Sequence, residues 1–270
     1  ENSRSSVYMD MTDVFPTNTE LEVELTFVSG TGGGRGGGGR GGRGGGGFEG
    51  VGSVASSGEA ATIRVHPSFF ELPDDDYQPR AFDSRSGYGS SSFQDYAVPL
   101  GEDMTQRFIR RHRLKKVDPN AAMSDPVEPI IYYLDPGTPE PVRSALLDGA
   151  RWWNQAFEAA GYRDAFQVVI RPDSISSLDA RYNVINWVHR STRGWSTGGS
   201  VSDPRTGEII KGVVTLGSLR VRQDYMMAEG LLSPYAGGDE TPPELAVWAL
   251  ARIRQLAAHE VGHTIGLGHN

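Results

Sequence analysis

Three histidines and one glutamate stand close together near the C-terminal end of the chain. His259 and His263 are four residues apart, so on a helix both imidazoles leave the same face. Glu260 lies about 100° further round the helix axis, beside the two imidazoles. Gly266 can end the helix with a positive φ, which lets the chain turn back and deliver His269 as a third nitrogen. Three neutral imidazoles that leave one coordination position open are typical of catalytic zinc, whereas a structural zinc is fully enclosed by protein ligands.

These residues follow the pattern H-E-x-x-H-x-x-G-x-x-H, in which the chain resembles the metzincin clan of zinc metalloproteases. The chain is also similar to large secreted bacterial members with a β-rich region before the catalytic domain, in residues 132–140, 151–157, 187–195 and 203–209. The resemblance implies one catalytic Zn²⁺ held by His259, His263 and His269, with Gly266 as the structural turn. It also implies a protein or peptide substrate and an extracellular or periplasmic location.

The chemistry predicted for this constellation is the hydrolysis of peptide bonds by zinc-activated water. Zinc lowers the pKa of a bound water toward ~7, and a carboxylate beside it can take the proton and hand it to the leaving amine. Glu260 is the residue predicted to act as this general base. The sequence therefore predicts a zinc-dependent endopeptidase. The alternative is a catalytically inactive zinc-binding or assembly module of the same fold, in which we would expect the base to have been lost first.

The elements expected before the histidines are those of the upper half of a metzincin catalytic domain, a twisted mixed sheet with two main helices. The capping box Thr241–Glu244 predicts the start of the helix that ends in the histidines. Before it, the periodicity predicts strands at 130–134, 166–170 and 183–188, a helix from Pro139 to Ala160 capped by Thr138, a hairpin over 198–216 and a helix over 219–229.

One strand of this sheet is a candidate for substrate binding. In the metzincin family an edge strand runs antiparallel to the bound peptide and pairs with its backbone. By position, Gly198, Gly199, Ser200 and Val201 are the candidate residues, and their small side chains would let a peptide come close. An ordinary hairpin edge is the alternative.

The predicted fold class is mixed α+β, with a β-rich region in residues 1–118 and the N-terminal part of a metzincin-like zinc protease domain in residues 119–270. Alternation of apolar and polar side chains predicts two antiparallel strands at 21–28 and 61–66. Fifteen of the 35 glycines lie between Gly30 and Gly50, which predicts a disordered Gly/Arg-rich loop. Residues 105–112 are expected to form a short helix.

Composition narrows the classes of partner. The net charge of −8 argues against a polyanion, so no nucleic-acid partner is expected, although three arginines in the Gly-rich stretch leave nucleic-acid or matrix binding as a rival hypothesis. The absence of cysteine excludes disulfides, thiolate zinc sites and a cysteine nucleophile. The sequence contains no run of 18 apolar residues, so no membrane-spanning segment is expected.

The chain reads as a piece of a longer protein, since it lacks an initiator methionine and stops one residue after His269. In metzincins, a methionine turn and a specificity pocket follow the third histidine. We therefore expect the rest of the same chain beyond residue 270 to complete the site. The 270 residues alone are expected to bind zinc weakly and to cleave poorly.

Overall fold

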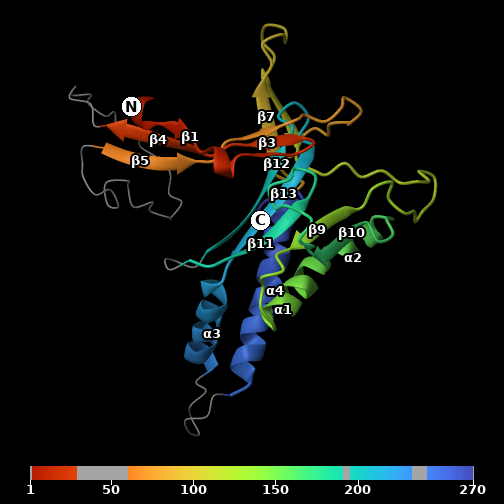
Figure 1. Cartoon of the computed structure of the whole chain (residues 1–270). Coiled ribbons are helices and arrows are strands. Elements are labelled where there is room, and N and C mark those ends of the chain that lie inside the picture. The colour runs from red at the N-terminus through yellow and green to blue at the C-terminus, as the bar shows by residue number, and fades with distance from the viewer. Residues whose placement is uncertain (1, 29–59, 191–194, 233–241, 270) are drawn as a thin grey trace. The chain divides into compact units, whose positions relative to one another are not determined.

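The computed structural model describes residues 2–28, 60–190, 195–232 and 242–269 of the chain (Figure 1). The chain forms two compact units, Glu1–Glu71 and Leu72–Asn270. The described part of the first unit is built from strands, and the second unit combines strands with α-helices, so the predicted mixed α+β class is confirmed. The predicted division near residue 118 stays a prediction. Within the described ranges, no helix has both the length and the apolar character that crossing a bilayer requires.

The first unit consists of two small sheets of short strands. Its elements are η1 (Asn2–Arg4), β1 (Ser6–Val7), η2 (Met9–Met11), β2 (Asp13–Val14), β3 (Asn18–Glu20), β4 (Val23–Val28), β5 (Ala60–Val65) and β6 (Ser68–Phe70). The sheet orders are β1-β4-β5 and β2-β3-β6. Leu25 of β4 lies opposite Ile63 of β5 in an antiparallel pair, which confirms the pairing predicted from alternation. The Gly/Arg-rich loop predicted at 30–50 lies outside the described residues.

A five-stranded sheet forms the centre of the second unit, in the order β10-β9-β11-β13-β12. Its strands are β9 (Ile130–Leu134), β10 (Phe166–Ile170), β11 (Asn183–Val188), β12 (Ser196–Ser202) and β13 (Ile209–Gly217). Four of them run parallel, and β12 pairs antiparallel with β13 at one edge. Every second residue of β9 is fully buried, at Ile130, Tyr132 and Leu134. The strands and the hairpin predicted from sequence are therefore confirmed.

Two helices, α1 (Val142–Arg151) and α4 (Glu244–Thr264), pack against each other and the sheet (Figure 1). Leu146 of α1 and Ile253 of α4 share one apolar core with the buried residues of β9. The helices come so close that a Cβ on Gly149 would lie 2.1 Å from the carbonyl oxygen of Arg254. A third helix, α3 (Leu219–Leu232), packs beside α4. The sheet and the packed helix α4 together set the position of the histidines.

The helix expected over residues 139–160 is divided and begins later than predicted. α1 starts at Val142, and α2 (Trp153–Ala159) follows a break at Trp152. Thr138 does not cap the helix, because its hydroxyl donates to the carbonyl of Asp135 at 2.9 Å in the preceding turn. Pro141, which has no N–H, occupies the N-cap position instead. Gly161 follows the end of α2 with φ +85°, as predicted.

The helix expected at 105–112 is wrong, because the segment forms strand β8 (Thr105–Ile109). β8 pairs antiparallel with β7 (Ser90–Gln94), and Phe108 lies opposite Ser91. The apolar pair Phe108–Ile109 fits either element in so short a segment. The partner strand decides the outcome, because it supplies backbone hydrogen bonds that the local sequence does not reveal.

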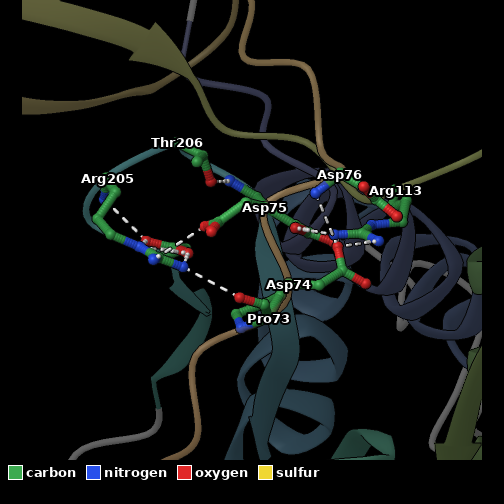
Figure 2. A network of polar contacts seen from close by, with 9 residues as sticks. Pro73, Asp74, Asp75, Asp76, Arg113, Arg205 and Thr206 are labelled. Atoms are coloured by element: carbon green, nitrogen blue, oxygen red, sulfur yellow. Dashed lines mark hydrogen bonds and ion pairs between the residues drawn. The ribbon is translucent and has the colours of Figure 1, made fainter.

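The acidic run after the start of the second unit is held by two arginines (Figure 2). Asp74 pairs with Arg113 at 2.8 Å, and Asp75 pairs with Arg205 at 3.2 Å. Arg113 also binds Glu208 through two hydrogen bonds of 2.7 and 2.9 Å. Residues 73–76 are thus linked to the turn between β12 and β13, while the three aspartate side chains stay exposed.

Candidate metal centre

The three predicted ligand histidines meet at one point. His259 and His263 lie one turn apart on α4, and His269 follows the end of that helix. Their Nε2 atoms are 3.1 Å apart for His259–His263, 3.0 Å for His263–His269 and 3.2 Å for His259–His269. Nitrogens bound at 2.0–2.1 Å around a tetrahedral zinc stand about 3.3 Å apart. The described residues contain this one cluster whose nitrogen, sulphur or carboxylate atoms could hold a metal ion.

The protonation of the imidazoles suits metal binding. The Nδ1 atom of His263 lies 2.9 Å from the carbonyl oxygen of Leu267, which can only accept a hydrogen bond. Nδ1 therefore carries the proton, and Nε2 of the neutral ring presents its lone pair to the other two histidines. Burial lowers the pKa of His259, and the neighbouring His263 and His269 lower it further. The hydrogen bond to Leu267 leaves Nε2 of His263 as the ligating atom, and the lowered pKa of His259 favours its neutral form.

The turn at Gly266 brings His269 back toward the helix. Gly266 has φ +104°, and its N–H donates to the carbonyl of His263 at 3.1 Å. The N–H of Leu267 donates to the carbonyl of Gly262 at 3.0 Å, which completes a Schellman motif. A Cβ at position 266 would lie 1.9 Å from the carbonyl oxygen of Arg110. Both the backbone conformation and the packing therefore require glycine here.

A distant loop holds the segment that carries His269, and no pattern in the sequence indicates this contact. The N–H of Gly89 donates to the carbonyl of Gly266 at 2.7 Å, and the N–H of Gly268 donates to the carbonyl of Gly87 at 2.8 Å. Tyr88 and Leu267 thus form an antiparallel bridge. The pairing joins residues nearly 180 positions apart in sequence, so no local pattern could reveal it.

The predicted general base lies beside the histidines in a buried position. Glu260 is 6 % exposed. Burial raises the pKa of its carboxyl, while charge on His263 and His269, the N–H of Gly198 and the guanidinium of Arg220 act in the opposite direction. The backbone of Glu260 lies directly against β12, at Gly198.

The four residues proposed to pair with substrate lie on the edge strand β12. Gly198 faces α4, and a Cβ there would lie 2.0 Å from the carbonyl oxygen of Glu260. The next residue, Gly199, points the other way, and no atom lies within 4 Å of the place its Cβ would occupy. Ser200 and Val201 continue the strand up to a register shift before Ser202. The structure thus places the candidate strand directly above the glutamate.

A pocket of about 460 Å³ adjoins Glu260 and His259. Its walls include Trp195 before β12, Arg220 on α3 and Arg252 on α4. The sequence offered no signal for these arginines, because Arg220 and Arg252 are 32 positions apart and meet only through the packing of α3 on α4.

Comparisons with known families place a zinc-protease signature at the same residues. Residues 241–270 match a family described as Met-zincin, and residues 1–117 match a family described as a domain of unknown function (DUF5117). No curated protein and no solved structure matches the chain. The Met-zincin match and the three-histidine cluster together support a metzincin-like zinc site.

Proposed function

We propose that this chain carries the catalytic zinc site of an endopeptidase in which Glu260 is the general base. The observation that carries the proposal is the convergence of three imidazole nitrogens within 3.2 Å of one another. Two of these imidazoles lie on α4, the helix that also carries the buried Glu260. The Met-zincin match over the same helix supports it. A protein or peptide substrate follows from the reaction class. Export from a bacterial cell rests on the family resemblance alone.

His259, His263 and His269 would hold the zinc through their Nε2 atoms and leave a coordination position open. Bound there, zinc supplies a water of near-neutral pKa and a Lewis acid for the peptide carbonyl. Glu260 accepts the proton of the attacking water and returns it to the leaving amine. Its burial raises the pKa of the carboxyl, which makes the carboxylate a stronger base. Gly198 of β12 packs against Glu260 and keeps this residue beside the strand.

The peptide would add to the open edge of the sheet as a strand antiparallel to β12, with Gly198–Val201 as its partners. β12 lies at the edge of the sheet and has β13 as its neighbour. Gly199 leaves space on the side away from α4, because nothing lies within 4 Å of its Cβ position. The short side chains thus support backbone pairing rather than side-chain recognition along this strand.

Casein digestion by the full-length protein tests the proposal. We expect a chelator to abolish cleavage and one equivalent of zinc per chain to restore it, because the three histidines are the ligands. A protein that binds one zinc per chain yet leaves casein and a mixed peptide library intact would instead be the inactive zinc-binding or assembly module.

A further inference from the structure

The pocket beside Glu260 contains two cationic side chains with donors to spare. Arg220 and Arg252 lie on different helices and line the pocket, with side chains that are 28 % and 36 % exposed. Each guanidinium has five N–H donors arranged to bind a carboxylate in a planar, paired manner. Both groups are therefore accessible from the same space that reaches the proposed base.

Asp224 on α3 lies close to the guanidinium groups of both arginines. This residue is fully buried, and its Oδ1 lies 3.4 Å from Nη2 of Arg220 and 3.8 Å from Nε of Arg252. Neither carboxylate oxygen has a hydrogen-bond partner within the described residues. Asp224 therefore attracts both guanidinium groups without using their hydrogen-bonding directions, and one negative charge faces two positive ones.

Other contacts orient the arginine and tryptophan side chains around the pocket. Arg252 hydrogen-bonds Gln255 and lies 6.0 Å from the ring of Trp248. Arg190 stacks 3.5 Å over the ring of Trp195, which also lines the pocket. In the part of the chain that the structure describes, the buried Nε of Arg220 has no hydrogen-bond partner. The exposed N–H donors of the two guanidinium groups, held in place by these contacts, favour binding of an anion over binding of an apolar side chain.

The position along β12 decides which part of a peptide would reach the pocket. Gly198 packs directly against Glu260 and so marks the level of the cleaved bond. Trp195 and Ser196, which line the pocket, precede Gly198 in the strand. A peptide antiparallel to β12 would therefore place the residues after the cleaved bond beside the pocket.

From these contacts we infer that the pocket binds a carboxylate of the substrate, on the C-terminal side of the cleaved bond. The inference rests on the proposed peptidase function and adds its substrate class: peptides with an acidic residue, or a free terminal carboxylate, just after the cleaved bond. Arg220 and Arg252 are the residues that set this specificity. Among the described residues that line the pocket, Glu260 is the one acidic residue, and charge on His263, His269 and Arg220 acts on its carboxyl.

Matched peptides test the inference on the zinc-loaded full-length protein. One pair differs by Glu against Gln just after the cleaved bond, and both peptides are amidated at the C-terminus. A second pair has a neutral residue there and ends in either a free carboxylate or an amide. We expect kcat/KM to favour the charged member of a pair about 10- to 100-fold. Preference in the first pair identifies a side-chain carboxylate, and preference in the second pair alone identifies a terminal one.

Arg252→Gln should bring the ratio of kcat/KM between the charged and the neutral peptide of a pair close to one, while the neutral peptide is still cleaved. Arg254→Gln is the matched control, because Arg254 lies on the same helix but pairs with Asp148 on α1 at 3.5 Å. The ratio is internal to each variant, so it does not depend on how much of the protein folds. Equal cleavage within both wild-type pairs would overturn the inference and leave the peptidase function intact. Failure to cleave any peptide would overturn both.

Discussion

Gly198 lies against Glu260 so closely that a Cβ on the glycine would stand 2.0 Å from the carbonyl oxygen of the glutamate. Burial raises the pKa of the Glu260 carboxyl, and the N–H of Gly198 acts in the opposite direction. The edge strand and the helix that carries the proposed base therefore meet without any intervening side chain. This contact joins the proposed substrate strand to the proposed catalytic residue.

Gly198→Ala should lower both stability and activity. The new methyl group must push β12 away from α4, which costs about 1–3 kcal/mol of unfolding free energy, and the shift moves the strand away from Glu260. Gly199→Ala is the control, since nothing lies within 4 Å of its Cβ position. Urea titration and casein cleavage measure the two effects. Equal behaviour of the two variants would show that the contact has no role.

Gly266→Ala should weaken zinc binding by about 10- to 100-fold. Alanine at φ +104° is strained, and its Cβ would lie 1.9 Å from the carbonyl oxygen of Arg110, so the turn that delivers His269 must move. Gly268→Ala serves for comparison, because its Cβ would meet the carbonyl oxygen of Gly87 at an ordinary 3.6 Å. Competition with a coloured zinc chelator gives both affinities. Unchanged affinity in Gly266→Ala would contradict the role of the turn.

Gly149→Ala should destabilise the protein, although alanine is the better helix former by about 1 kcal/mol. Its Cβ would lie 2.1 Å from the carbonyl oxygen of Arg254, so α1 and α4 must separate. Gly230→Ala on α3 should instead stabilise by about 0.5–1 kcal/mol, because that position is open. Thermal melts of the two variants should therefore shift in opposite directions. A rise in Tm for Gly149→Ala would refute the close helix contact.

Acid should destabilise the fold partly through His112. Burial lowers the pKa of His112 to about 4 from its ordinary 6.5. The unfolded chain therefore takes up this proton first as the pH falls, and stability present above pH 6.5 is lost progressively down to about pH 4. The side chain of His112 is partly exposed to solvent. We therefore expect the unfolding free energy to fall by about 2 kcal/mol between pH 7 and pH 4.5.

His112→Gln isolates this contribution, because glutamine does not titrate. The difference in unfolding free energy between wild type and variant should shrink by the same amount over this pH range. Denaturant titrations at both pH values measure it. A difference that stays constant with pH would rule out His112 as the titrating group.

The sequence predicted those elements whose residue pattern repeats along a short stretch of the chain. Ile130, Tyr132 and Leu134 alternate and form β9, and the spacing of His259 and His263 places both on one face of α4. The prediction that a single helix begins at Pro139 was wrong, because the Thr138 hydroxyl donates a hydrogen bond within the preceding turn. The periodicity of apolar residues does not reveal this hydrogen bond. The helix expected at 105–112 was wrong because Thr105–Ile109 pairs as a strand with Ser90–Gln94, a partner that the local pattern does not reveal.

The candidate site also has one part that the sequence predicted and one part that it did not. The ligands and the base follow one another within eleven residues, so their pattern is visible in the sequence. The loop at Gly87–Gly89 that holds Gly266 and Gly268, and the pairing of Arg220 and Arg252 around Asp224, arise only when distant segments pack. No single stretch of residues encodes either arrangement.

The most direct measurement of the central proposal compares bound zinc and casein cleavage in the same samples of full-length protein. The samples are wild type, Glu260→Ala and the control Glu244→Ala, whose glutamate lies in the first turn of the same helix. We predict one zinc per chain in all three, with cleavage reduced about 100- to 10,000-fold only in Glu260→Ala. Undiminished cleavage by zinc-loaded Glu260→Ala would contradict the assignment of Glu260 as the general base.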